Sequence, residues 1–508
     1  MKAFMRAVGI ATLVAVGTSL PALAQMATIQ EAQNVAENWI SLVIHNHGSW
    51  GSHENATVRG IQELTRGPRV LGYFCPVEPV GFVVVSSRQE LAPVKAYSTF
   101  NDLNPKLDDG PTDLVKGGLE RTLNAIESRL GPIEDVRTEE LVGILEMEYR
   151  PAWEVLKRDP PTFQRELDAG LLRTDYQEGE VMLASHWHQA PPYNDDCPNM
   201  GCNWPWYGNY NQNALVGCVA LAGAQIMRYW GWPPYGAGNP YNDNYDWTNM
   251  LNMYIWDNIQ NRFEDENDNP VTQAQINAVA ELCREIGIAV NMDYGCDISL
   301  AVTADMEGVY EDHYRYSALC GTRDRADYSA IEWFECIKTQ CEYNRPMQYR
   351  IPGHSIVVDG WRETGIGDTI LREYHINYGW GLLIGNGGDI WYTLDQIYGG
   401  SPDDEFMVED IFPAVALPAF LNGSYAKPDN FPYRYFTRDT TGEWATLEPG
   451  QFLQFLPNVT VRCTAGSIRF QGANPNFTRL FTRGDDGRGA WLLDATIKLY
   501  ENGMIALH

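Results

Sequence analysis

Cys218 directly follows Gly217, at the start of an Ala-rich run in the segment "NALVGCVALAGAQIMRYWGWPP", residues 213–234. This run predicts a helix, and the N-terminus of a helix favours a thiolate over a thiol. Gly217 allows a sharp backbone turn and a close approach of a substrate. Nucleophilic chemistry also needs a base, a group that orients the base, and donors for an oxyanion. Cys218 is therefore a candidate nucleophile, with a small buried hydrophobe and half of a disulfide as alternatives.

The best candidate for the base is His354, which opens the strand-like run "HSIVVDGW" 136 residues after Cys218. This order and separation fit the roughly 130–150 residues that papain-like enzymes place between nucleophile and base. His375, in "REYHINYGWGLL", competes for the role. Strand alternation puts Asn377 on the same face as His375, and Asn377 could accept a hydrogen bond from the imidazole and fix its tautomer. The residues alone favour His354 over His375.

The candidate oxyanion donors are the backbone N–H of Cys218 and the side-chain amide of Gln189. Gln189 lies in "HWHQAPPYN", next to Trp187. Preorganised donors of this kind stabilise the charge that develops on a substrate carbonyl. A solvated loop glutamine is the alternative interpretation of Gln189.

Several segments must position these residues. Residues 27–45 have apolar positions at helical spacing, and "VLGYFCPVEPVGFVVVSS" predicts two short strands around a proline-containing turn. Up to about residue 175 no cluster of catalytic residue types occurs. From residue 183 Trp, Tyr, Pro, Asn and Gly crowd together, as in ordered loops around a site. Beyond residue 415, short alternating segments and the "ENG" turn at 501–503 predict a small all-β module.

Six motifs occur in the order found in the streptopain family of secreted papain-like cysteine peptidases, which the chain resembles over residues 185–400. They are "WHQAPPYN", "GCVALAGAQIMRYW", "YDWTNML", "AELCREIGIAVNMDYG", "GHSIVVDGW" and "HINYGWG". The earlier stretch "GFVVVSSRQELAPVKAYS" is similar to the family's inhibitory propeptide. The resemblance implies an α+β protein with a papain-like two-lobed catalytic domain. The expected order is a signal peptide (1–24), an α+β propeptide domain (25–180), the peptidase domain (181–415) and the β module (416–508).

The resemblance also implies roles for single residues. Cys218 would be the nucleophile, His354 the general base, Gln189 the oxyanion-hole glutamine and Asn377 the group that orients the base. The final motif of the family has a Trp after the Asn, whereas this chain has Tyr378, which covers less area as a shield of the imidazole. The residues expected to contact the substrate are Trp187, Ser299, Tyr378 and Trp380.

A second departure from the family is the loop after "MDYG". The family has a small Ser/Gly-rich loop there, whereas this chain has "CDISLAVTAD" with Cys296, Ile298 and Leu300. A disulfide at Cys296 would stiffen this border of the substrate cleft. The side-chain preference of the family therefore does not carry over to this chain.

The composition and the N-terminus bear on compartment and partners. The net charge of −29 repels nucleic acid and anionic membranes, which excludes both as partners. The N-terminal "MKAFMRAVGIATLVAVGTSLPALAQ" has the basic, apolar and small-residue regions of a signal peptide, so we expect secretion to the extracellular space. Most of the ten cysteines would then form disulfides, with a nucleophile left free. No organic cofactor is expected.

Two candidate metal sites are weak on sequence grounds. His186, His188, Cys197 and Cys202 suggest zinc, but a Cys pair at this spacing in an exported protein more often closes a loop as a disulfide. The acidic segment "FEDENDNP" lacks the glycine and terminal glutamate of an EF-hand. We therefore expect no metal at either place.

The function that the sequence predicts is a secreted cysteine endopeptidase, made as a zymogen and acting on a protein or peptide through a thioester. Residues 25–180 would act as an intramolecular inhibitor until the enzyme cleaves its own chain in "RTDYQEGEVM" or just before it. An amidase or a transglutaminase would use the same chemistry. A catalytically weak binding protein on the same fold is the remaining alternative.

Overall fold

The computed structural model describes residues 23–108, 110–145, 147–233, 235–381, 388–393 and 405–412, together with the backbone of short strands between residues 444 and 507. Most of the expected signal peptide, residues 1–24, lies outside the described residues. Of the predicted β module only the strand backbone is described. No helix in the described part of the chain is long and apolar enough to cross a membrane.

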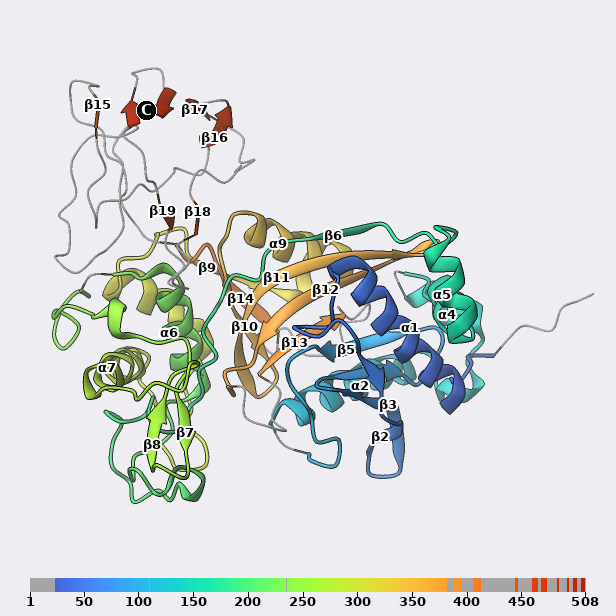
Figure 1. Cartoon of the computed structure of the whole chain (residues 1–508), viewed down its shortest axis with the longest axis horizontal. Helices are drawn as coiled ribbons and strands as arrows, with labels where there is room; N and C mark the ends of the chain where they lie inside the picture. Colours follow the sequence, from blue (N-terminus) through green and yellow to red (C-terminus); the bar gives the residue numbers. More distant parts are fainter. Residues whose placement is uncertain are drawn as a thin grey trace, which may run out of the picture.

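The N-terminal part is an antiparallel sheet between two helical layers (Figure 1). The helix predicted over residues 27–45 is α1 (Ile29–His47), which Thr28 caps through a capping box. The two predicted strands are β3 (Arg69–Glu78) and β4 (Phe82–Ser86). Alternate residues of β4 point to opposite faces, so that Val83 packs with α1 while Val84 packs with α2 (Gly110–Leu130). The other elements are β1 (Thr57–Val58), β2 (Gln62–Arg66), β5 (Val94–Ser98), α3 (Thr138–Ile144), α4 (Arg150–Leu156), α5 (Pro160–Asp168) and β6 (Tyr176–Glu178).

This sheet continues into the second half of the chain without a break. Its strand order is β1-β3-β4-β5-β13-β12-β11-β10-β14-β9, with β6 paired to β11. The added strands are β9 (Gly321–Asp324), β10 (Met347–Ile351), β11 (His354–Ile366), β12 (Thr369–Asn377), β13 (Asp389–Thr393) and β14 (Phe406–Glu409). The junction is the pairing of Ala96 and Tyr97 with Tyr392 and Trp391. The expected propeptide and peptidase domains therefore share one sheet.

A helical lobe lies beside the sheet (Figure 1). The predicted Ala-rich helix is α6 (Cys218–Trp230), which packs against α7 (Gln273–Ala289) and against β11. It ends at Gly231 in a left-handed conformation, just before the prolines. The lobe also contains the hairpin β7 (Ile255–Asp257) and β8 (Arg262–Glu264), and α9 (Ala330–Glu342) packs on β11. The remaining elements of the chain are α8 (Met306–Gly308), the π-helix η5 (Val309–His313), and the 3₁₀ helices η1 (Ile133–Asp135), η2 (Pro205–Tyr207), η3 (Trp247–Asn249), η4 (Thr303–Asp305) and η6 (Arg325–Asp327).

The C-terminal strands pair as antiparallel sheets, as their alternating sequence predicts. One sheet has the order β15-β20-β21-β17-β16, and β18 pairs with β19. The predicted hairpin around "ENG" corresponds to the pairing of β20 with β21. Their bounds are β15 (Trp444–Ala445), β16 (Val459–Thr464), β17 (Ser467–Gly472), β18 (Thr482–Arg483), β19 (Trp491–Leu492), β20 (Ile497–Leu499) and β21 (Met504–Leu507).

Candidate active site

Cys218 is the first residue of α6, and the backbone conformation of the residue before it requires glycine. Gly217 has a φ of 88°, and a Cβ there would lie 2.6 Å from the side chain of Met292. No side chain caps this helix, so its first N–H groups stay available at the positive end of the helix dipole. The local sequence thus holds a thiol where a thiolate and an oxyanion are both stabilised.

His354 is the first residue of β11, directly after the turn that joins it to β10. Its imidazole is buried and forms a hydrogen bond with the thiol of Cys218. Burial would raise the pKa of Cys218, but the charge of His354 and this hydrogen bond outweigh burial and lower it. Burial would likewise lower the pKa of His354, and its interactions with Cys218 raise it instead. These opposite shifts favour a thiolate–imidazolium pair.

The other side of the imidazole meets the main chain. Nε2 of His354 lies 2.8 Å from the carbonyl oxygen of Tyr378, to which it donates when protonated. This bond leaves Nδ1 free to face the thiol, so the carbonyl fixes both the tautomer and the ring orientation. The Tyr378 ring lies nearly parallel to the imidazole with centroids 6.4 Å apart, and Trp380 lies edge-on at 6.3 Å. The aromatic pair covers the imidazole and keeps water from it.

Asn377 does not orient the imidazole directly, contrary to expectation. Its Nδ2 donates to the carbonyl of Ser185 at 2.8 Å, and its Oδ1 accepts from the N–H of Gly379 at 2.9 Å. Oδ1 also accepts from Nε2 of Gln225 at 3.1 Å. The side chain closes the turn at residues 377–379, directly where β12 ends. Asn377 therefore positions the carbonyl of Tyr378.

His375, the competing candidate for the base, forms an ion pair with Asp359. Its Nδ1 lies 2.6 Å from Oδ1 of Asp359, and both side chains are buried. The second oxygen of Asp359 accepts from the N–H of Leu183 at 2.8 Å. The charge of Asp359 outweighs burial and raises the pKa of His375. This pair fastens the segment around residue 183 to the sheet.

Gln189 is joined to the nucleophile segment through the main chain. Its carbonyl accepts from the N–H of Val216 at 3.0 Å, and its side chain is half-buried. Trp187 is wholly buried and donates Nε1 to the carbonyl of Leu251 at 2.9 Å. The expectation that Trp187 contacts the substrate is therefore not met, because its ring belongs to the core of the helical lobe.

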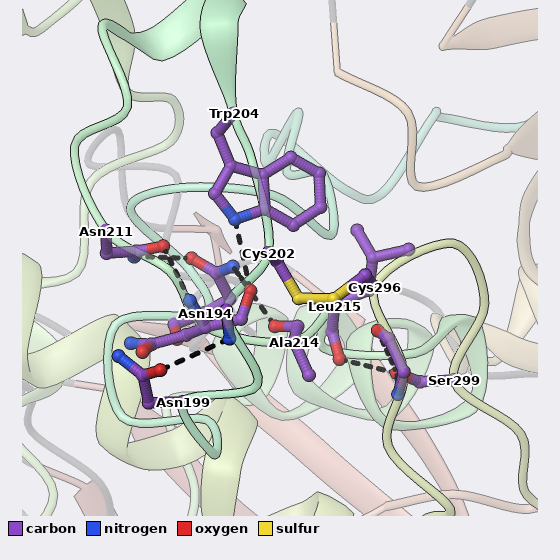
Figure 2. The surroundings of a disulfide bond; sticks show 12 residues. Asn194, Asn199, Cys202, Trp204, Asn211, Ala214, Leu215, Cys296 and Ser299 are labelled. Atoms are coloured by element: carbon purple, nitrogen blue, oxygen red, sulfur yellow. Dashed lines mark hydrogen bonds between the residues drawn. A yellow bond between two sulfur atoms is a disulfide. The ribbon is translucent and has the colours of Figure 1, made fainter.

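The loop that departs from the family is fastened by a disulfide between Cys202 and Cys296, which span 94 residues (Figure 2). The hydroxyl of Ser299 donates to the carbonyl of Leu215 at 2.8 Å and accepts from the N–H of Gly295 at 3.0 Å. Ser299 is only 3% exposed, so its role is to hold the loop against residues 213–217 and not to contact the substrate. The disulfide expected at Cys296 is present.

The loop presents apolar side chains to solvent beside a cavity. Ile298, Leu300 and Val302 are 58%, 55% and 59% exposed. The adjoining cavity, of about 440 Å³, lies between residues 301–304 and strands β9, β10 and β14, and is lined by Arg350 and Phe406 among others. The guanidinium of Arg350 donates to the carbonyl of His354 at 3.2 Å. Arg350 was not predicted as a site residue, and its position four residues before His354 was the available signal.

The cysteine expectations need correction. Cys197 does not pair with Cys202, and seven cysteines in the described part of the chain are free: Cys75, Cys197, Cys218, Cys283, Cys320, Cys336 and Cys341. Most of these are buried and pack as small hydrophobes. Burial raises the pKa of Cys75 and that of Cys197 to about 12, which makes both thiols unreactive. The side chain of Cys463 lies outside the described residues.

Two family models match this chain. Residues 187–386 match the Peptidase C10 family, and residues 24–116 match the Spi protease inhibitor family. Streptopain of Streptococcus pyogenes serotype M28 is 29% identical over 229 residues, which are 42% of this chain and 54% of streptopain. The thiol protease/hemagglutinin PrtT of Porphyromonas gingivalis is 23% identical over 346 residues, which are 63% of this chain and 35% of that protein.

The chain thus spans about half the length of the streptopains that it matches. Among solved structures, a fragment of prointerpain A from Prevotella intermedia aligns with 69% of this chain and 98% of the fragment, at 21% identity and a TM-score of 0.47. Active interpain A from the same organism aligns with 46% of this chain and 95% of its own, at 22% identity and a TM-score of 0.32. In its residues 187–386, this chain is therefore similar to the Peptidase C10 family and to the streptopains.

Proposed function

We propose that the chain is an exported cysteine endopeptidase made as a zymogen. The observation that supports this most directly is the geometry around Cys218: a helix N-terminus on one side and, on the other, an imidazole held by the carbonyl of Tyr378. The opposite pKa shifts of the two side chains are those that a nucleophilic thiolate needs. Export rests on the N-terminal sequence of residues 1–24.

The proposed reaction begins when the thiolate of Cys218 attacks a peptide carbonyl carbon. The N–H of Cys218 and the side-chain amide of Gln189 donate to the oxyanion that forms. The imidazolium of His354 then protonates the leaving amine, and a thioester remains on Cys218. His354, now neutral, takes a proton from water, the hydroxide attacks the thioester, and the carboxylic acid leaves as the thiolate is restored.

The segment before the peptidase domain is proposed to act as its inhibitor. The backbone of Gly110, at the start of α2, packs on the ring of Trp380, so that a Cβ there would lie 2.9 Å from the indole. Trp380 in turn lies against His354. The inhibitor-like segment therefore closes the cleft within two side chains of the imidazole. Its removal is needed before a polypeptide can reach Cys218.

Self-cleavage is proposed just before β6. Part of "RTDYQEGEVM" forms β6, which pairs with β11, and paired strands are poor substrates because their backbone groups are already bonded. The stretch just upstream is more accessible, with Leu171 75% exposed. We therefore place the cut at residues 169–175.

The test is labelling of the matured protein with a thiol-directed peptide electrophile, followed by peptide mapping, beside a casein-cleavage assay. We expect fast labelling at Cys218, its loss in His354→Ala, and cleavage of casein. Labelling without cleavage would favour an amidase or a transglutaminase, which release ammonia. Absence of selective labelling would overturn the proposal and favour a binding protein.

A further inference from the structure

Arg350 lies beside the catalytic pair but takes no step in the proposed reaction. It is the last residue but one of β10, and only Pro352 and Gly353 separate β10 from β11, which begins at His354. The closing pair of this hairpin is Ile351 with His354. The place of the candidate base therefore depends on how firmly this short turn is held.

The side chain of Arg350 folds back onto the turn. Its Nη1 donates to the carbonyl of Ile351 and, at 3.2 Å, to the carbonyl of His354. Both acceptors belong to the closing pair, so one charged, planar guanidinium ties the ends of the two strands together. The carbonyl of Tyr378 holds the imidazole of His354, whereas Arg350 holds its backbone.

The positive charge of Arg350 is not neutralised by these bonds, because both acceptors are uncharged carbonyls. Across β10, β14 and β9, Arg350 is aligned with Phe406 and Asp324. Residues directly opposite each other on paired strands share a face, and these three line the cavity beside residues 301–304. Asp324, the other charged residue of this lining, is two strands away, roughly 9–10 Å between the backbones.

This charge acts on both members of the catalytic pair. Burial raises the pKa of Cys218, while its interactions with His354 and the charge of Arg350 lower it. Burial lowers the pKa of His354, its bonds with Cys218 and Tyr378 raise it, and the charge of Arg350 opposes that rise. A fixed cation favours each loss of a proton beside it, so it moves both titrations of the pair toward lower pH.

We propose that Arg350 is a positioning residue of the active site, which fixes the turn before His354 and supplies a permanent positive charge that favours the thiolate of Cys218. This inference rests on the proposed function. An arginine suits both tasks, because its guanidinium carries several N–H donors in one plane and stays charged wherever the catalytic pair titrates.

Two substitutions separate the hydrogen bonds from the charge. Arg350→Gln keeps an amide donor and removes the charge, whereas Arg350→Lys keeps the charge and loses the planar donor group. The matured enzyme is inactivated with iodoacetamide, a small neutral reagent, over a pH range that covers both limbs of the profile, and peptide mapping follows the adduct at Cys218. The kcat and KM on a fluorogenic peptide are measured over the same range.

The matched control removes a positive charge elsewhere in the peptidase domain. Arg284 lies on α7, with its guanidinium over the ring of Tyr294, 4.8 Å from the centroid, and Arg284→Gln should leave both profiles unchanged. We expect Arg350→Gln to move both limbs of the inactivation profile to higher pH. Arg350→Lys should keep both limbs in place and lower kcat by on the order of 10, because the turn is less firmly held.

The proposal is overturned by unmoved limbs in Arg350→Gln, by limbs that move as far in Arg350→Lys or Arg284→Gln, or by an unchanged kcat in Arg350→Lys. Denaturant unfolding shows whether each variant is folded, and Arg350→Met is the second charge-free variant if Arg350→Gln is not. Failure of the proposed function gives a different result. If the parent enzyme is alkylated selectively at Cys218 but cuts neither casein nor the peptide, the peptidase activity is refuted, while the inactivation profiles still decide whether the charge of Arg350 favours the thiolate.

Discussion

Gln225 provides the sharpest test of how the candidate base is held. It lies on α6 and is fully buried, and its hydrogen bonds go to Ser185, Trp187 and Asn377 and not to His354. Its Oε1 accepts from the hydroxyl of Ser185 at 3.1 Å and from the N–H of Trp187 at 3.3 Å, and its Nε2 donates to Oδ1 of Asn377 at 3.1 Å. If Asn377 acts through the turn that carries the Tyr378 carbonyl, loss of Gln225 should disturb catalysis at a distance.

The perturbation is Gln225→Met, alone and combined with Asn377→Ala. Methionine has nearly the same shape, so the cost comes from polar partners left unsatisfied, about 1–3 kcal/mol for each. Asn377→Ala leaves the N–H of Gly379 and the carbonyl of Ser185 without their partner, at a total cost of roughly 2–6 kcal/mol. The two variants remove one shared bond, so the double variant should be less destabilised than the sum by about 1 kcal/mol.

The assay is steady-state kinetics of the matured enzyme on a fluorogenic peptide, with denaturant unfolding of the same variants. We expect each single variant to lower kcat by on the order of 10–10², because a shift of about 1 Å in the carbonyl misplaces the imidazole. The pH profile of kcat/KM should lose its upper limb at a lower pH, since the carbonyl no longer supports the imidazolium. Normal kcat in Gln225→Met with a low kcat in Asn377→Ala would refute this reasoning and favour a direct contact of Asn377 with the base.

Three further predictions concern the scaffold. Replacing Cys202 and Cys296 together by serine should lower the free energy of unfolding by roughly 4–5 kcal/mol, because the disulfide joins residues 94 positions apart. It should also raise KM, because the cleft loop is released. Urea unfolding and peptide kinetics measure the two effects, and an unchanged KM would show that the loop does not affect substrate binding. Gly217→Ala should abolish activity and destabilise the fold, because the φ of 88° and the 2.6 Å approach to Met292 exclude a side chain; an active variant would contradict the described turn. The folded-state pKa of His375 is raised, so its ion pair stabilises the fold fully below the unfolded pKa of about 6.5, and this stabilisation is lost as the pH rises through the folded-state pKa. The midpoint temperatures of Cys218→Ser with and without His375→Gln should therefore differ most at acidic pH. A constant difference from pH 5.5 to 8.5 would refute the ion pair.

The elements with clear periodicity or turn signals were predictable from the sequence. The helix at Ile29–His47 has a capping box and an apolar face, and α6 has an Ala-rich run between Gly217 and Gly231, so local rules define both. The pairing of Cys218 with His354 was also predictable, because their spacing in the chain fits that of nucleophile and base in papain-like enzymes. Local signals are sufficient where the neighbours that matter are near in sequence.

Long-range choices were not predictable in the same way. Strand alternation puts His375 and Asn377 on one face of β12. Whether these side chains meet Asp359 or the imidazole of His354 depends on how β11 and β12 pair. The burial of Trp187 was not predictable for the same reason, because the sequence around a loop aromatic residue looks the same whether the ring lines a cleft or packs in a core. The disulfide joins residues 94 positions apart, and no spacing rule could select Cys296 over Cys197 as the partner of Cys202.

The pairing of β5 with β13 has a consequence for activation. A cut before β6 breaks the chain but leaves Ala96 and Tyr97 bonded to β13, Lys95 bonded to the carbonyl of Thr393, and the hydroxyl of Thr393 bonded to Val94. After the proposed cut, we therefore expect the nicked protein to stay latent until the strands separate. Separation then leaves β13 as an open edge, with unpaired N–H and C=O groups that can template another extended chain. The proposed maturation would therefore expose this strand edge, which a released propeptide, a second molecule or a substrate strand can cover.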